Sequence, residues 1–300
     1  MEKVVCVEEQ LYKEMEKLQA TDAKVWTEEE LPAGLIRERI PKHVAVMLDG
    51  NRRWAKQKGL EPMLGHHGSS HSLKLVAELC CKWGIKVLTV FAFSTGNWVR
   101  PKVEVDFLMK AFEISCERDL EVYIRNKVRV SFIGDRLKLP IALQKVFEET
   151  TEATKNYTRL HVIVGVNYGG REDIIQACQS MCLKAKDNLI QPEDVDENLL
   201  NQELETKCTE FPYPDLLIRT SGERRISNFL MWQLAYTELY FEECLWPDFG
   251  EKEFVKALKS FQERRRRYGG DDEDNLGEEV YTQSQPIIEE YGKHFIHSSK

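Results

Sequence analysis

The chain has 300 residues, enough for one large domain or two small ones with a full core. Hydrophobic residues make up 42% and charged residues 31%, as in ordinary globular proteins, and the net charge of −8 argues against a general nucleic-acid binder. No stretch approaches the roughly 20 apolar residues of a membrane span.

The two ends of the chain differ in composition from its middle. Residues 1–40 are rich in charge and predict a helical extension and linker, and residues 271–300 predict an acidic, polar tail. We therefore expect one domain over residues 41–270. The eight cysteines include no CxxC pair and no histidine at zinc spacing, so they are interpreted as reduced core residues.

Apolar, β-prone runs alternate with helical patterns along this domain. Such runs predict buried strands at 44–48, 86–93, 128–133, 160–166 and 215–218, with a possible sixth at 238–241. Helical spacing is found between them and again at 251–268, and residues 229–235 suggest a helical turn or two. The alternation predicts a single α/β domain with a mostly parallel, six-stranded sheet flanked by helices.

The first strand ends in the sequence Asp49-Gly50-Asn51-Arg52-Arg53. Gly50 permits a tight turn, and Asn51 is a good N-cap for a following helix. The amides of a first helical turn, with guanidiniums beside them, suit a phosphate or diphosphate. A carboxylate beside an anion needs a bridging cation, which is usually Mg²⁺. The alternative is an ordinary strand-to-helix turn with solvated arginines.

Polar residues also follow the other strands, at the edge where open α/β sheets bind ligands. They are Ser94, Asn97, Trp98, Arg100, Asn167, Arg219, Arg225 and Ser227, with Glu238 a little later. Guanidiniums outnumber acids in this set, which favours one or two bound diphosphates. The sequence lacks GxGxxG after the first strand and lacks GxxxxGK[ST], which weighs against dinucleotide and P-loop sites.

These motifs together resemble the cis-prenyltransferases, the undecaprenyl and dehydrodolichyl diphosphate synthase family, in its plant branch. The resemblance runs from about Pro41 to Gly270 and rests on HVAVMLDGNRRWA, the Gly65-His66 pair, VFAFSTGNWVRP, VNYGGREDI, PDLLIRTSGERRISNFLMWQLAYTELYF, WPDF and RRYGG. It implies a sheet with an elongated apolar tunnel, usually in a homodimer, and Mg²⁺-dependent joining of an allylic diphosphate, such as dimethylallyl diphosphate, to isopentenyl diphosphate.

Carried over by position, the resemblance implies catalytic roles for Asp49, Arg53 and Asn97. Asp49 would bind Mg²⁺, and Glu238 would supply a second contact to the metal. Substrate binding is implied for Gly50, Asn51, Arg52, Trp54, His66, Ser94, Trp98, Arg100, Arg219, Arg225, Ser227, Arg267 and Gly269. The last two match a terminal RxG element that in this family reaches the partner subunit's site.

Two departures from the family pattern bear on the site, one on the loop that could change the product and one on the number of cations at the allylic diphosphate. Gly96 stands where the family loop usually carries an acid, and Pro62 and Met63 occupy the neighbourhood of a usual arginine. We expect a short- to medium-chain cis-prenyl diphosphate as product. The alternatives are head-to-middle coupling of two dimethylallyl diphosphates to a lavandulyl-type product and a non-catalytic partner subunit. The expected location is the plastid, with a transit peptide absent or removed, or the cytoplasm.

Overall fold

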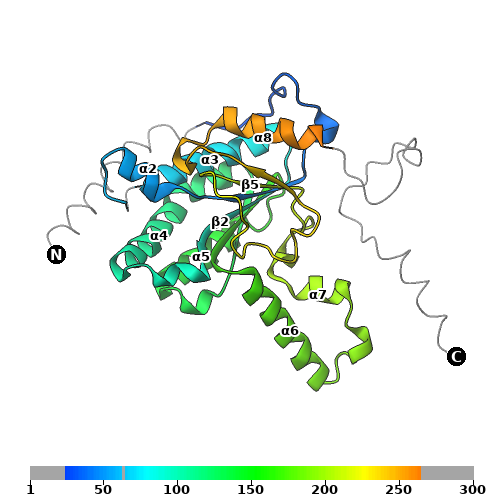
Figure 1. Ribbon diagram of the computed structural model, residues 1–300. Helices are drawn as coiled ribbons and strands as arrows, with labels where there is room; N and C mark the ends of the chain where they lie inside the picture. The colour runs from blue at the N-terminus through cyan, green and yellow to red at the C-terminus, as the bar shows by residue number, and fades with distance from the viewer. Residues whose placement is uncertain (1–23, 63–64, 265–300) are drawn as a thin grey trace.

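The computed structural model describes residues 24–62 and 65–264 of the protein. Their centre is a six-stranded, all-parallel sheet in the order β3-β4-β2-β1-β5-β6 (Figure 1). The strands are β1 (His43–Met47), β2 (Val87–Ser94), β3 (Val128–Ile133), β4 (Leu160–Tyr168), β5 (Leu216–Arg219) and β6 (Glu238–Phe241). The expected fold class is confirmed, and each predicted strand lies within two residues of its expected bounds.

The helices of the domain lie between these strands or, for the last helix, after β6. They are α2 (Asn51–Gln57), α3 (Gly65–Trp83), α4 (Lys102–Arg125), α5 (Ile141–Thr154), α6 (Gly170–Lys186), α7 (Glu197–Glu203) and α8 (Glu251–Glu263). Short 3-10 helices occur at Arg37–Arg39, Thr95–Val99, Arg136–Lys138, Pro192–Asp194, Glu205–Cys208 and Trp246–Asp248. Helices α6 and α7 extend away from the sheet at the lower right of Figure 1. No helix in the described ranges is long and apolar enough to cross a membrane.

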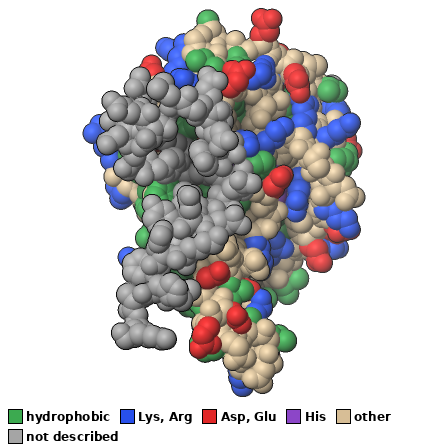
Figure 2. Space-filling view, turned by 90° about the vertical axis from the view of Figure 1, so that its right-hand side faces the viewer, with side chains coloured by type: hydrophobic (Ala, Val, Ile, Leu, Met, Phe, Trp, Pro, Cys, Tyr) green, Lys and Arg blue, Asp and Glu red, His purple; other side chains and the backbone are tan. Residues whose placement is uncertain are grey.

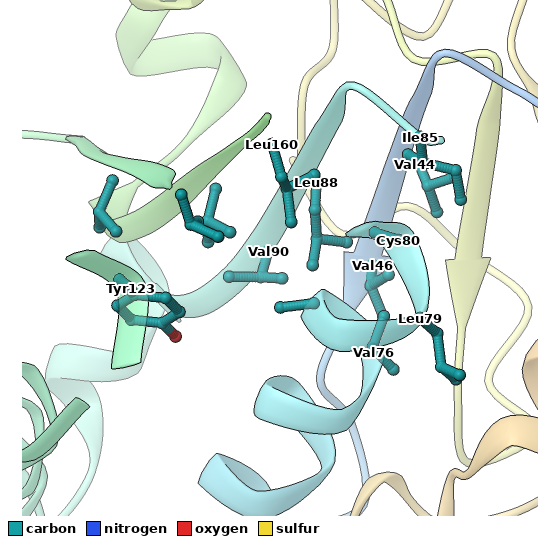
Figure 3. Close-up of a cluster of buried hydrophobic side chains, with 14 of the residues drawn as sticks. Val44, Val46, Val76, Leu79, Cys80, Ile85, Leu88, Val90, Tyr123 and Leu160 are labelled. Carbon is teal, nitrogen blue, oxygen red and sulfur yellow. The ribbon is translucent and has the colours of Figure 1, made fainter. Parts of the chain in front are cut away.

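Strand β1 is buried on both faces, as expected of a central parallel strand. One face carries Val44 and Val46, which pack in the larger core with residues of α3, α4, α5 and α8. Figure 3 shows Val76 and Cys80 of α3 against these valines. The opposite face packs on a second cluster, in which Phe229 stacks on Phe91 with ring centroids 4.4 Å apart.

Two predicted helical segments differ from the observed structure. Residues 229–236 form turns rather than a helix, and the positive φ of Leu230 (43°) interrupts helical geometry there. Helix α8 ends at Glu263 because Arg264 is extended, and its guanidinium is bonded to Glu238. Cys178 and Cys182 are exposed, so the prediction that the cysteines lie in the core is wrong for these two.

The described part of the N-terminal segment lies against the domain. Trp26 is 4% exposed, and its backbone N–H donates to Asn126 Oδ1 at 2.7 Å. Ile36 exchanges two hydrogen bonds with the side chain of Gln262 in α8. The helix expected before residue 24 and the tail expected from residue 271 lie outside the described residues, and the domain boundaries remain predictions.

The order of the strands places one pair of strand ends at a switch point. The chain leaves β1 towards β2 and leaves β5 towards β6, so adjacent strands β1 and β5 are followed by connections that run in opposite directions along the sheet. Open α/β sheets bind ligands outside the carboxyl ends of two such strands. Asp49 and Arg219 are located there.

Candidate active site

Asp49 lies two residues beyond the end of β1, between two guanidiniums. Its Oδ2 accepts a hydrogen bond from Arg219 Nη2 at 2.8 Å, and its Oδ1 lies 3.8 Å from Arg53 Nη2. Arg219 ends β5 and Arg53 belongs to α2, so the sheet and a helix both contribute to the site. The Asp49 side chain is 35% exposed, so its carboxylate remains accessible to a ligand.

Gly50 makes the turn from β1 into α2. Its φ is +107°, and an added Cβ would meet Leu245 Cδ2 at 2.8 Å, so both the backbone and the space favour glycine. The sequence predicted Asn51 as the N-cap of α2, but the N-cap is Gly50. Asn51 instead begins the helix and donates its side-chain amide to Leu48 O at 3.1 Å.

Arg219 is buried, at 4% exposure, and connects the two halves of the site. Beside its bond to Asp49, its Nη1 donates to Ser227 Oγ at 2.8 Å and to the carbonyl of Arg225. The loop that carries Ser227 has positive φ values at Ser221, Ser227, Asn228 and Leu230. Such backbone strain outside glycine persists only where the surroundings hold it, and it is concentrated at functional sites.

Glu223, which the sequence did not single out, partly neutralises the predicted surplus of positive charge. Its Oε1 lies 3.5 Å from Arg53 Nη2, and its Oε2 accepts from Arg225 Nη1. Arg53 and Arg225 are therefore joined through one carboxylate. Glu223 lies four residues after Arg219, and nothing in the local sequence predicts that it pairs with Arg53 and Arg225.

His66 lies in a second group of charges with Arg52, Arg100 and Glu104. Glu104 is buried, with its two oxygens 3.3 Å from Arg100 Nη1 and 3.8 Å from Arg52 Nη1. Burial, followed by the charges of Arg100 and Arg52, lowers the pKa of His66 to about 3, so the imidazole is neutral near pH 7. Sequence reasoning missed Glu104, which lies in the first turn of α4, four residues after Arg100.

The loop after β2 is held by contacts with its own strand and with β4. The N–H of Ser94 donates to Asn97 Oδ1 at 3.0 Å, and Trp98 Nε1 donates to Asn167 Oδ1 at 2.7 Å. The Trp98 ring also packs edge-on against Phe93. The loop thus lies at the carboxyl edge, but its hydrogen bonds run to β4 and not to Asp49. At Gly96 an added Cβ would meet only Ser94 Oγ, at 3.7 Å.

Two predicted residues, Trp54 and Glu238, are placed differently from the rest. Trp54 donates its indole N–H to Asp248 Oδ1 at 2.8 Å. Glu238 begins β6 opposite Leu216, at the amino edge, about 16 Å from the level of Asp49 along the strands, and it pairs with Arg264 at 2.6 Å. The expectation that Glu238 contacts a metal beside Asp49 is therefore not met within one chain. Arg267, like Gly269, lies outside the described residues.

The chemistry of the site fits a ligand with many oxygen atoms. Within the described residues, several buried side-chain atoms have no hydrogen-bond partner, and those at the carboxyl edge are Asn51 Oδ1, His66 Nε2, Arg219 Nε and Ser221 Oγ. Unpaired buried polar atoms are rare and often mark a ligand site. Among the described residues, no cluster of three or more His, Cys, Asp or Glu side chains could hold a metal alone. A magnesium ion would fit Asp49 only together with substrate oxygens, which is its usual mode of binding.

Comparison with known proteins identifies the family. Residues 47–269 match the family model described as putative undecaprenyl diphosphate synthase. The chain belongs to this cis-prenyltransferase family. A curated relative, dehydrodolichyl diphosphate synthase 2 of Arabidopsis thaliana, is 57% identical over 243 residues, which are 81% of this chain and 78% of the relative.

Other family members extend the comparison. A chloroplastic (2Z,6Z)-farnesyl diphosphate synthase of Solanum lycopersicum is 54% identical over 78% of this chain and 80% of its own length. Among solved structures, lavandulyl diphosphate synthase of Lavandula x intermedia, in complex with dimethylallyl diphosphate, superposes with a TM-score of 0.76 at 40% identity, covering 78% of this chain and all of that one. The chain is thus a prenyltransferase of isoprenoid biosynthesis, similar to enzymes that make cis-prenyl diphosphates.

Proposed function

We propose that the protein joins an allylic diphosphate, dimethylallyl or longer, to isopentenyl diphosphate and releases pyrophosphate and a short- to medium-chain cis-prenyl diphosphate. The observation that carries this proposal is the junction of Asp49, Arg53 and Arg219 at the switch point of a cis-prenyltransferase sheet. Relatives named for dehydrodolichyl, (2Z,6Z)-farnesyl and nerylneryl diphosphate synthesis support regular extension.

The residues divide into two anion-binding groups in this proposal. The amides at the start of α2, together with neutral His66, Arg52 and Arg100, hold the allylic diphosphate, since helix N-termini and guanidiniums bind phosphate oxygens. Arg219, Arg225 and Ser227 hold isopentenyl diphosphate. Gly50 lets the backbone approach the substrate, and Ser94, Asn97 and Trp98 order the loop that faces the reacting carbons.

Asp49, together with substrate oxygens, would hold Mg²⁺, which would supply positive charge against the negative charge of the departing diphosphate. Arg53 and Arg100 add guanidinium charge on the same side, and they act at the moment the allylic C–O bond breaks. The electron pair of the isopentenyl double bond then forms the new C–C bond. The resulting cation loses one proton to the released pyrophosphate, and a new double bond forms. Glu223 and Glu104 keep the arginines in place before substrate arrives.

The proposed assembly is a homodimer. The ground for this proposal is the resemblance to the family, whose members usually act as dimers. On the part of the face in Figure 2 that is not drawn in grey, basic and acidic side chains are interspersed. Because several relatives carry chloroplastic names, we also propose the plastid as the location.

Head-to-middle coupling is the second candidate, favoured by the lavandulyl diphosphate synthase structure and by Gly96. An assay of the purified protein distinguishes the candidates. The protein is incubated with Mg²⁺ and radiolabelled dimethylallyl diphosphate, with and without isopentenyl diphosphate. Regular extension predicts product only when isopentenyl diphosphate is present. Product without it would show irregular coupling, and no product under either condition would indicate a partner subunit, despite the presence of Asp49 and Arg219. Loss of product in EDTA checks the metal requirement.

A further inference from the structure

We propose that Thr220, which directly follows β5, is a positioning residue for Asp49. This inference rests on the proposed function, because it assigns Thr220 its role through the metal-binding acid. Thr220 is fully buried, at 0% exposure, and does not reach the open part of the site. Its hydroxyl is directed to the main chain at the end of β1.

The Thr220 hydroxyl contacts both polar groups of the Asp49 main chain. Its Oγ1 accepts from the N–H of Asp49 at 3.1 Å and donates to the carbonyl of Asp49 at 2.7 Å, with Met47 O a longer acceptor at 3.3 Å. Regular pairing of β1 with β5 ends at Met47 and Arg219. The hydroxyl therefore links the two strands beyond their last backbone pair. It does so at Asp49, the residue whose carboxylate must be positioned.

The segment that carries Thr220 is itself fixed from the side of β6. The N–H of Ser221 donates to Cys244 O at 2.7 Å, and the N–H of Gly222 donates to Glu242 O at 2.9 Å. The carbonyl of Ser221 accepts from Arg53 Nη1 at 3.2 Å. One rigid segment thus holds the main chain of Asp49 and one of the two guanidiniums that face its carboxylate.

Removing the hydroxyl should leave the fold intact, because Asp49 has other backbone partners. Its N–H also approaches Met47 O at 2.9 Å, and its carbonyl also accepts from Trp246 N at 3.0 Å. What is lost is the contact between the Asp49 main chain and Thr220, the residue that follows β5. We therefore expect the carboxylate to be less well placed towards Mg²⁺ while the protein remains folded.

The test compares Thr220→Val, which keeps the volume without the hydroxyl, with Thr220→Ser, which keeps the hydroxyl. Loss of an outer contact to a metal ligand typically costs about 10-fold to 100-fold in affinity or activity, so we expect Thr220→Val to lower kcat and raise the Mg²⁺ concentration for half-maximal rate by about tenfold. Thr220→Ser should restore most of both. Calorimetric titration with inorganic pyrophosphate and Mg²⁺ should show the same weakening without turnover.

Thr154 provides a matched control away from the site. It is also fully buried, accepts from Val130 N at 3.0 Å and donates to Thr150 O at 2.8 Å. Thr154→Val should lower thermal stability and leave the Mg²⁺ requirement unchanged. If Thr220→Val gives insufficient folded protein, Thr220→Ala removes the same hydroxyl with less crowding.

A Thr220→Val protein with the wild-type Mg²⁺ requirement, or a Thr220→Ser protein as impaired as Thr220→Val, would overturn the inference. Measuring Asp49→Ala in parallel distinguishes failure of this inference about Thr220 from failure of the proposed function. If Asp49→Ala retains full turnover, the proposed site is wrong. If Asp49→Ala is inactive and Thr220→Val is normal, only the role of Thr220 fails.

Discussion

The two edges of the sheet hold their charged groups in different ways. At the amino edge, Asp215 Oδ2 accepts from the N–H groups of Lys42 and His43 at 2.8 and 3.1 Å, and Glu238 pairs with Arg264. At the carboxyl edge, Asp49 is shared between two guanidiniums, and its side chain is 35% exposed. Acids at the first edge hold chain segments together, whereas those at the second leave capacity for a ligand.

The largest difference in kcat is expected when one carboxylate at each edge is substituted, Asp49 at the carboxyl edge and Asp215 at the amino edge. Asp49→Asn removes the charge that binds the metal and should lower kcat by about 10²-fold to 10³-fold, the cost of losing a main electrostatic group, with little change in Tm. Asp215→Ala leaves two backbone N–H groups without this acceptor, costs about 1–3 kcal/mol, and should lower Tm while the folded protein keeps its specific activity. Steady-state kinetics and thermal unfolding of both variants measure the contrast. Equal effects of the two variants on kcat would contradict it.

Glu205 should give an intermediate effect, on the pH dependence of stability. Its Oε2 accepts from Gly134 N beside the end of β3, and burial raises its pKa from 4.5 to about 7, with Asp173 and Asp135 adding to the rise and Gly134 N and Arg136 opposing it. Because the folded state holds the proton more tightly than the unfolded state, this contribution is complete below pH 4.5 and is lost as pH rises through 7.

Glu205→Gln should therefore reduce the fall in stability between pH 5 and pH 8, as measured by urea unfolding at several pH values. Glu203→Gln is the control, since its hydrogen bond from Lys184 lowers the pKa of Glu203. That contribution is present above pH 4.5 and is lost at lower pH, so the control should leave the slope between pH 5 and pH 8 unchanged. An unaltered slope in Glu205→Gln would show that Glu205 is not the titrating group.

The smallest effect is expected at Gly96, on the loop of the carboxyl edge that is not bonded to Asp49. A Cβ there would meet only Ser94 Oγ, at an ordinary contact distance of 3.7 Å, so Gly96→Glu should fold normally. With regular extension as the function, product identity should stay the same and kcat should change by no more than about threefold, as for other surface substitutions. Product chromatography checks this, with Gly96→Gln as the uncharged control. A change of product between the two variants would assign regiochemistry to this position.

Local sequence was sufficient to predict the strands and the family motifs. Runs such as Val44–Leu48 are apolar because both faces of a parallel strand are buried, and that requirement is visible in neighbouring residues. The sequence also placed Asp49 and Arg219 at strand ends. Glu238 could have been placed better, because it is the first residue of the predicted strand 238–241 and so belongs to the amino edge of a parallel sheet.

Only the tertiary structure decided which of these residues meet. Asp49 contacts Arg219 and Thr220 across 170 residues because β5 lies beside β1, and strand order is set by long-range packing that no local pattern encodes. The pairing of Arg53 with Glu223 depends on the same neighbourhood. A sequence thus specifies which side chains stand at the strand ends, while the order of the strands determines which of them share a charge or a hydrogen bond.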